Sequence, residues 1–338
     1  MKNRLFRSAG VWMGICIAIL LFGGWLLTRT YVMAAYSLPT MSMEKTIPLG
    51  GKVLVNKINY LPISRGDILA FHFPEGDTVI DLPEFQSMRP YYDVIRELGR
   101  GNSDEGRQKV LADPDSYPLS IRPVSRRENY LKRCIGIPGD TLELRDELLY
   151  INRRWQAWPE KAETYFQVIT DGRQLDEDNM KAQYGVNLLN REEVRPLDTA
   201  NAYQMLLTWK AYDKMIKDGF AKRIIPDIDL NEDVFPYDPA HHWTRDNYGP
   251  LWVPKKGASI ALTPLNYPVY ERIIRTYEGN KLEMRDGKIY INGHEENSYT
   301  FKMNYYWMIG DNLHGSQDSR YWGFVPEDHL IGKTSVTM

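Results

Sequence analysis

The sequence predicts a mainly β protein that follows a single N-terminal transmembrane helix and contains a partly helical insertion. Three observations support this fold class. Residues 11–28 carry no charge, short β-branched and aromatic runs separated by Pro and Gly follow from residue 52, and apolar residues recur at helical spacing between residues 202 and 216. Aromatic residues make up 12% of the chain, which is typical of proteins rich in pleated strands.

The N-terminal segment at 11–28 reads VWMGICIAILLFGGWLLT. A bilayer core requires about 20 apolar residues in a helix, and residues 31–36 can extend the segment to that length. Three basic residues precede the segment and one follows it, which predicts a cytoplasmic N-terminus and an external position for the rest of the chain. A cleaved signal peptide with a cut near residues 33–35 is the alternative, but its apolar core would be unusually long.

Short strands are predicted after the apolar segment. KVLVNKI at 52–58 and DILAFHF at 67–73 are β-branched or aromatic runs with turn residues between them. Residues 75–128 are polar and irregular and are interpreted as an inserted excursion. The segment at 129–152 predicts a strand, a Pro-Gly turn and two further strands.

A second excursion, from about 155 to 248, contains the best helical pattern of the soluble part. We expect a packing helix that begins near Asp198 or Thr199 and ends at Gly219. Its apolar positions are Ala202, Met205, Leu206, Trp209, Tyr212 and Ile216.

An internal echo links residues 130–152 with residues 270–292. Both segments align without gaps and share a Tyr, a turn Gly, the string L-E-x-R-D and the string Y-I-N. We expect a duplicated strand–turn–strand ribbon, in which Lys132 of the first copy corresponds to Arg272 of the second. Convergence of two unrelated ribbons on good turn residues is the alternative.

Several classes of function are disfavoured. The net charge of −2 gives no basic field for a nucleic-acid partner. Two distant cysteines, Cys16 and Cys134, form no CxxC pair, and the six histidines include no HExxH motif. We therefore expect neither a metal nor another cofactor.

Two residues form a candidate catalytic pair. A serine such as Ser42 becomes nucleophilic when a base takes its proton, and lysine can serve if burial lowers its pKa. Lys132 lies within the apolar strand segment Y-L-K-R-C-I-G, where alternation places it and Arg133 on opposite faces. A surface Lys-Arg pair is the more common interpretation of such a dipeptide.

A third segment, MIGDNLHGSQDSRYWGFVPEDHLIG at 308–332, combines a tight Gly310-Asp311-Asn312 turn with hydroxyls and charges. Its Asp318 and Arg320 are suited to form a pair. The alternative is a polar loop packed under the aromatic residues that follow it.

Together the three segments resemble the bacterial type I signal peptidases, or leader peptidase family. The Ser-Met motif of that family matches Ser42-Met43, its Y-x-K-R-x-x-G-x-P-G-D motif matches residues 130–140, and its G-D-N-x-x-x-S-x-D-S-R-Y-W-G motif matches residues 310–323. The resemblance covers residues 36–80, 129–152 and 282–333. Lys45 stands where the family commonly has proline, and one membrane span is predicted where the family often has two.

The resemblance implies a serine endopeptidase that cleaves signal peptides from exported preproteins after small residues. Ser42 would be the nucleophile and Lys132 the general base, while Thr40 and the backbone N–H of Ser42 would form the oxyanion hole. Ser316 would orient Lys132, and Asp318 and Arg320 would brace the site. The substrate would add as a strand beside residues 37–41 and 129–131, and the residues expected to contact it are Leu38, Pro39, Met43, Tyr130 and Leu131.

The implied fold is a membrane helix followed by two antiparallel β-sheet domains. Residues 1–35 would form the cytoplasmic tip and anchor, residues 36–80, 129–152 and 300–338 the catalytic β-domain, residues 81–128 an inserted excursion, and residues 153–299 a second β-domain with a helical insertion. The implied location is the outer, periplasmic side of the bacterial cytoplasmic (inner) membrane. Partners would be signal peptides and the lipid bilayer, with the secretion translocon as a further candidate.

Two alternatives remain open at the level of sequence. One is a related peptidase that processes a single dedicated partner. The other is an inactive, membrane-tethered homologue that acts as a binding module.

Overall fold

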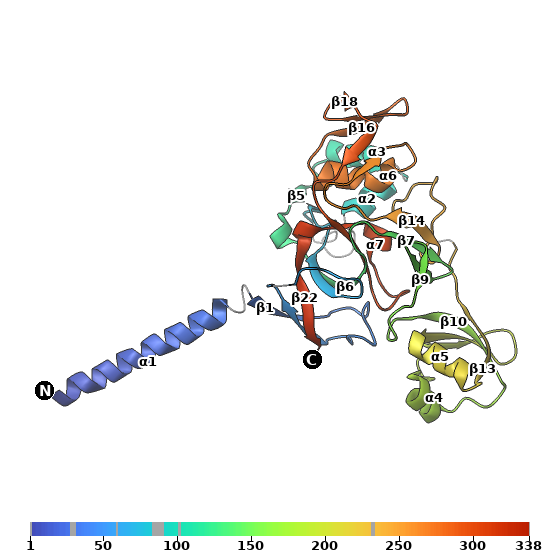
Figure 1. Cartoon of the computed structure of the whole chain (residues 1–338), viewed down its shortest axis with the longest axis horizontal. Helices are drawn as coiled ribbons and strands as arrows, with labels where there is room; N and C mark the ends of the chain where they lie inside the picture. The colour runs from blue at the N-terminus through green and yellow to red at the C-terminus, as the bar shows by residue number, and fades with distance from the viewer. Residues whose placement is uncertain are drawn as a thin grey trace.

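The computed structural model describes residues 2–27, 32–58, 60–82, 91–100, 103–230 and 234–337. Antiparallel strands dominate the body of the molecule, as the sequence predicts. Helix α1 (Lys2–Leu27) projects from this body, and Figure 1 shows it well separated from the sheets.

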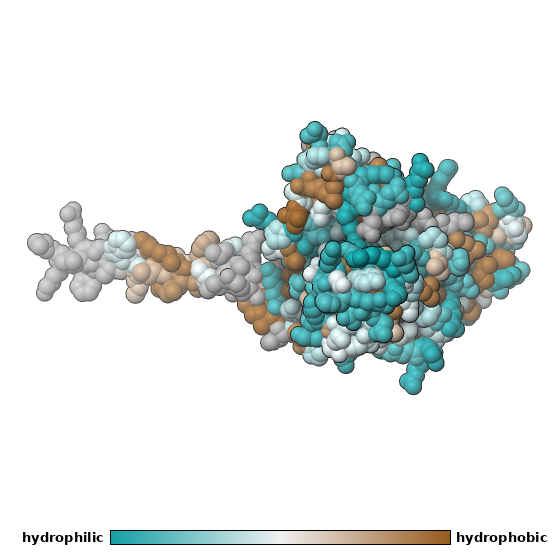
Figure 2. Space-filling view, turned by 90° about the horizontal axis from the view of Figure 1, so that it is seen from above, coloured by the Kyte–Doolittle hydropathy of each residue, from teal (hydrophilic) through white to brown (hydrophobic). Residues whose placement is uncertain are grey.

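The N-terminal segment ends earlier than expected. Strand β1 (Met33–Ser37) pairs with β2 (Lys52–Asn56), so the extension of the apolar helix through residue 36 is wrong. Trp12, Leu20 and Trp25 on α1 are exposed, and Figure 2 shows a band of apolar residues on this helix. Among the described residues, no helix is both long enough and apolar enough to cross a membrane. The predicted span includes residues 11 and 26–28, whose side chains are not among those that the structure describes.

A seven-stranded sheet collects segments from both ends of the chain. It confirms the strands predicted at 52–58 and 67–73 as β2 and β3. Its strands follow the order β1, β2, β22 (Leu330–Thr337), β3 (Ile68–His72), β6 (Asn129–Gly136), β20 (Tyr305–Ile309) and β21 (Val325–Pro326). Strand β6 therefore lies between β3, which pairs Leu69 with Lys132, and β20, which pairs Ile309 with Arg133.

Two apolar clusters pack around this sheet because successive strand residues point to opposite faces. One contains Leu38, Met43, Ile47, Val53, Val55, Ala70 and Leu131. The other contains Ile63, Leu69, Phe71, Cys134, Tyr306, Met308, Trp322 and Val325.

The internal echo is a repeated hairpin. β7 (Thr141–Arg145) and β8 (Leu148–Ile151) pair in the same register as β16 (Leu282–Arg285) and β17 (Lys288–Ile291). The turn residues Asp146 and Asp286 both have positive φ, as two-residue hairpins of this kind require. The preceding segment of the second copy is α6 (Tyr267–Arg272) followed by η3 (Ile273–Tyr277), so the strand expected there is wrong.

Pro268 explains this difference, because proline in the first turn favours helix entry and disfavours a central strand. The two hairpins also belong to different sheets. The first joins β14 (Tyr248–Trp252) and β9 (Arg154–Gln156), and the second joins β18 (His294–Glu295). A large core of aromatic and aliphatic residues, including Tyr248 and Trp307, fills this region.

Residues 163–226 form a compact lobe, which we call the insertion lobe. Its sheet has the order β11 (Val194–Pro196), β12 (Ala202–Thr208), β10 (Glu163–Thr170) and β13 (Ala221–Pro226), and it carries α4 (Glu177–Tyr184) and α5 (Trp209–Lys217). The helix predicted from residue 199 is thus correct only in its second half. Residues 202–208 form a strand because pairing with β10 and β11 buries Ala202, Met205 and Leu207.

The helix begins instead at Thr208, whose side chain accepts a hydrogen bond from the backbone N–H of Ala211. Gly219 follows the helix end with positive φ, as expected. Residues 75–128, predicted to be irregular, contain β4 (Thr78–Ile80), α2 (Tyr91–Leu98), α3 (Ser103–Ala112), β5 (Leu119–Ile121) and η2 (Val124–Arg126). The remaining elements are β15 (Ser259–Ala261), β19 (Ser298–Thr300), α7 (Ser319–Trp322) and η4 (Glu327–His329).

Candidate active site

Lys132 lies inside the protein on the central part of β6. Its relative exposure is 3%, and burial lowers the pKa of its amine to about 8. Asp318 raises that pKa and Arg320 lowers it, so the two charges oppose each other and burial dominates. A fraction of the Lys132 amine is therefore neutral near pH 7.

Arg133 lies on the opposite face of β6, as the alternation of the strand predicts. Its guanidinium donates two hydrogen bonds to the carboxylate of Asp311, with donor–acceptor distances of 2.7 and 2.5 Å. Thr46 Oγ1 donates to the same carboxylate at 2.5 Å. These hydrogen bonds connect β6, through Arg133, and the turn that contains Ser42, through Thr46, to the loop that begins at Gly310.

Ser42 lies in a tight turn that follows β1. Its relative exposure is 5%, and the side chain of the next residue, Met43, is fully buried in the core. The backbone N–H of Ile47 donates to the carbonyl of Met43 at 2.7 Å, which closes the turn. Thr40 Oγ1 lies 3.1 Å from Ser42 Oγ, so these two hydroxyls share a hydrogen bond.

Gly310 lies where the segments that carry Ser42, Lys132 and Ser316 come together. Ile309 pairs with Arg133, so the next step of that register brings Gly310 level with Lys132. A Cβ atom on Gly310 would lie 2.5 Å from the Ser42 carbonyl oxygen and 2.2 Å from Ser316 Oγ. The backbone N–H of Asn312 also donates to that Ser42 carbonyl at 3.1 Å. Only glycine allows this close approach.

The Ser316 hydroxyl is buried, and its oxygen has no hydrogen-bond partner within the described residues. A buried hydroxyl without a partner is unfavourable, because its desolvation is not compensated. An amine or a substrate group that reached it would satisfy it. Ser316 is thus available to hold another group in this site.

Asp318 and Arg320 form a buried ion pair beneath the loop. Arg320 donates two hydrogen bonds to the Asp318 carboxylate at 2.9 and 2.8 Å, and both residues are at most 2% exposed. Asp318 also accepts the backbone N–H of Gly310, and Arg320 donates to the carbonyl of Leu313 at 2.6 Å. The pair therefore fixes the backbone on both sides of Asn312.

The residues expected to contact a substrate have different environments. Pro39 is exposed, whereas Leu38 and Leu131 pack together in one apolar cluster. Tyr130 is half-buried and stacks on Phe73 at a centroid distance of 4.6 Å. Met43 has no exposed surface, so it supports the turn from below instead of presenting its side chain to a substrate.

The edge of β6 beside the site is open. Strand β20 pairs with β6 from residue 133 onward, and in the described part of the chain no strand pairs with residues 129–132 on that side. Unpaired backbone N–H and C=O groups of such an edge can accept an added strand.

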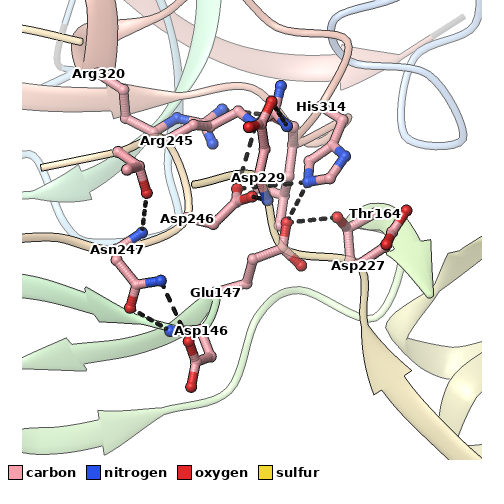
Figure 3. Close-up of polar contacts among 12 residues, drawn as sticks. Asp146, Glu147, Thr164, Asp227, Asp229, Arg245, Asp246, Asn247, His314 and Arg320 are labelled. Carbon is pink, nitrogen blue, oxygen red and sulfur yellow. Dashed lines mark hydrogen bonds and ion pairs between the residues drawn. The ribbon is translucent and has the colours of Figure 1, made fainter. Parts of the chain in front are cut away.

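A polar cluster that the sequence did not predict anchors the same loop (Figure 3). His314 Nε2 lies 2.6 Å from Glu147 Oε1 and 3.4 Å from Asp246 Oδ1, and Thr164 Oγ1 donates to Glu147 Oε1 at 2.7 Å. The two carboxylates raise the pKa of His314 against the opposing effect of burial. No motif could indicate this cluster, because its members come from four distant segments.

The donor atoms of Glu147, Asp246 and His314 lie within 4.8 Å of one another, which is a donor set that a divalent cation can use. Arg245 Nε already lies 3.2 Å from Asp246 Oδ1 and supplies positive charge there. Direct hydrogen bonds and ion pairs thus compensate much of the negative charge of this cluster, and we assign it a role in anchoring the loop.

The insertion lobe also touches the loop directly. The backbone N–H of Glu163 donates to the Asp311 carbonyl at 2.7 Å, and the N–H of Leu313 donates to the Glu163 carbonyl at 2.9 Å. The Glu163 side chain is fully buried, and burial raises the pKa of its carboxyl to about 7. The lobe is therefore attached to the candidate site itself.

Comparison with known proteins gives a consistent result. The family model described as signal peptidase, peptidase S26, matches residues 9–196 and 295–338. Signal peptidase I of Buchnera aphidicola subsp. Baizongia pistaciae is 21% identical over 309 residues, which cover 90% of this chain and 69% of that protein. Signal peptidase I of Leptolyngbya laminosa is 25% identical over 131 residues, which cover 34% of this chain and 64% of that protein. For signal peptidase I of Bacillus caldolyticus the values are 24% over 147 residues, 43% and 52%.

Proposed function

The chain belongs to the signal peptidase family, peptidase S26, and from this membership we propose that it removes signal peptides from exported preproteins with a Ser42–Lys132 dyad. Membership makes it a serine endopeptidase. The observation that carries the assignment of the base is the burial of Lys132, which lowers its pKa to about 8. A neutral amine can accept a proton, whereas an ordinary surface lysine is almost fully protonated at neutral pH.

In the proposed reaction, Lys132 Nζ takes the proton of Ser42 Oγ as that oxygen attacks the substrate carbonyl carbon. The backbone N–H of Ser42 and the Thr40 hydroxyl stabilise the negative oxygen that forms. Lys132 then donates its proton to the leaving amine, and water hydrolyses the acyl-enzyme. Ser316, whose hydroxyl is otherwise without a partner, would hold the amine in place.

The substrate would lie along the open edge of β6 at residues 129–131 and beside residues 37–41. Leu38, Pro39, Tyr130 and Leu131 belong to these segments. We expect small residues at the first and third positions before the cut, as the resemblance to the signal peptidases implies. The carboxylate–guanidinium pair of Asp318 and Arg320 would keep the Gly310 loop fixed while the substrate binds.

We further propose that α1 anchors the enzyme in the bacterial cytoplasmic membrane as a single span with its N-terminus inside. The exposed apolar side chains of α1 and its separation from the body support this proposal (Figures 1 and 2). The catalytic part would then lie on the outer side, next to the bilayer and within reach of the secretion translocon. The division into a catalytic β-domain and a second β-domain at 153–299 is part of the same proposal.

The test uses the full chain in detergent with several unrelated preproteins. Cleavage of most of them after small residues supports a general signal peptidase. Cleavage of one alone indicates a peptidase dedicated to one partner, and cleavage of none, with the chain folded, indicates an inactive homologue.

The dyad is tested with Ser42→Ala, Lys132→Ala and the double variant. Each single change should lower the rate by about three orders of magnitude or more, and the double variant should be no worse, because the two groups act as a unit. Ser259→Ala and Lys281→Ala, both at exposed sites far along the chain, serve as matched controls. Substantial activity in Lys132→Ala would show that another group is the base.

A further inference from the structure

A pocket of about 240 Å³ lies between the Ser42 turn and the insertion lobe. We call it the lysine pocket. One side is formed by Lys45, three residues after Ser42, and the rest by the end of α4, by β12 and by α5. Its lining residues are Lys45, Gln183, Tyr184, Gly185, Leu206, Thr208, Lys210, Ala211 and Lys214.

The lysine pocket is held in a fixed position relative to the site. Besides the contacts of Glu163 with the Gly310 loop, the backbone N–H groups of Trp209 and Lys210 donate to the carbonyls of Ala162 and Glu160, each at 3.0 Å. Below the pocket, α5 packs on the lobe core through the fully buried Met215. Residues bound in the pocket would therefore keep a constant distance from Ser42.

The charge of the lining is one-sided. Among the described residues, the lining contains three lysines and no acidic residue. Lys214 pairs with Asp218 at 2.6 Å outside the pocket, and its Nζ lies 5.5 Å from the centre of the Tyr184 ring. Lys45 forms an ion pair with Glu193 at 3.8 Å and acts on the buried carboxyl of Glu163, so its charge is partly compensated from outside the lining. Ammonium groups around an apolar floor fit a peptide that carries carboxylates.

The position of the pocket indicates which part of a substrate would reach it. Under the proposed function, the residues before the cut occupy the segment that leads up to Ser42, at 37–41. The polypeptide after the cut must leave on the other side of Ser42, where the turn at 43–46 carries Lys45. The lysine pocket begins at that turn.

We propose that the lysine pocket binds acidic residues of the preprotein on the mature side of the cut, so that the insertion lobe is a specificity element of the enzyme. This inference rests on the proposed function for the identity of its ligand. It does not depend on Lys132 being the base.

Binding tests the proposal without cleavage. The full chain with Ser42→Ala is titrated in detergent with two fluorescent peptides that differ only after the cut, where one has four Glu and the other four Gln. Exposed ion pairs contribute modestly, so we expect the Glu peptide to bind about three- to tenfold more tightly at low salt. The preference should shrink as salt is added.

The preference should disappear in the double variant Lys210→Gln/Lys214→Gln and persist in Lys281→Gln/Lys288→Gln. The control lysines lie on the β16–β17 hairpin, at the opposite end of the molecule, and are ion-paired much as Lys214 is (Figure 1). The double variant Lys210→Glu/Lys214→Glu replaces two of the three lysines of the lining by carboxylates and should reverse the preference toward a peptide with four Lys. A reversal cannot result from misfolding, which would weaken binding of all peptides.

Equal binding of the Glu and Gln peptides, or a preference that survives the pocket double variant, would overturn the proposal. Cleavage by the unmodified enzyme separates this failure from that of the proposed function. If both peptides are cut equally well and bound equally well, the pocket assignment is wrong and the peptidase stands. If the Glu peptide is bound preferentially but no peptide or preprotein is cut, the pocket binds acidic peptides, whereas the peptidase, and with it the identification of the ligand as a preprotein, is wrong.

Discussion

The pH dependence of cleavage is the most direct consequence of the buried Lys132. Burial lowers its pKa from 10.5 to about 8. Each pKa unit corresponds to about 1.4 kcal/mol, so the change from 10.5 to about 8 represents about 3 kcal/mol of preference for the neutral amine. At pH 7 about one enzyme in ten would have a neutral Lys132, against about one in three thousand without the shift.

The expected profile follows from these fractions. The value of kcat/KM for a peptide containing a signal-peptide cut should rise about tenfold per pH unit up to pH ~8 and then level off, because only the neutral amine accepts the Ser42 proton. Initial rates are measured from pH 6 to 10, with folding monitored by circular dichroism. The buried carboxyl of Glu163, next to the Gly310 loop, has a pKa of about 7 and also titrates in this range. Glu163→Gln removes that group and should leave the midpoint near 8 unchanged.

Two outcomes would contradict this reasoning. A rate that still rises about tenfold per pH unit at pH 10 would mean that the lysine is not desolvated in the working enzyme. A rate independent of pH between 6 and 9 would mean that no group with this pKa is the base. Lys132→Arg should be inactive at every pH in the series, because a guanidinium stays protonated.

Three further predictions concern the site and its support. Gly310→Ala should reduce kcat by at least about a hundredfold in a folded enzyme, because its Cβ would lie 2.2 Å from Ser316 Oγ and because small displacements of reacting groups are costly; normal turnover would show that the loop adjusts. His314→Ala removes the cationic partner that the two buried carboxylates of Glu147 and Asp246 share, and it should lower the free energy of unfolding by about 3 kcal/mol, measured by urea denaturation; a loss below about 1 kcal/mol would show that the cluster does not anchor the loop. Lys132→Met should raise the free energy of unfolding at pH 7 by up to about 3 kcal/mol, because the folded-state pKa of Lys132 lies below its unfolded value and a protonated lysine is costly to bury. The gain should vanish between about pH 8 and 10.5, where the unfolded wild-type chain binds more protons than the folded chain; a gain independent of pH would assign it to packing.

Local patterns were sufficient for the parts of the fold in which short-range rules decide the outcome. The strands at 52–58 and 67–73 and the hairpin at 141–151 follow from alternation and turn residues, which act within a few positions of the chain. The echoed hairpin at 282–291 was predicted for the same reason. The motifs around Ser42, Lys132 and Gly310 also indicated the candidate catalytic residues, because each motif is a continuous string.

Patterns failed where pairing with a distant segment decided the structure. The apolar residues of the segment 202–208 have helical spacing. The segment nevertheless forms a strand, because the neighbouring strands β10 and β11 supply backbone hydrogen-bond partners and a core. The sequence alone determined the catalytic candidates and the mainly β class. Only the tertiary structure decided that Lys132 is desolvated, that Gly310 brings Ser42 and Ser316 together, and that the Glu147–His314 contact and the lysine pocket exist. Desolvation and electrostatic coupling depend on which atoms surround a group in space, and those atoms come from segments far apart along the chain that no local pattern connects.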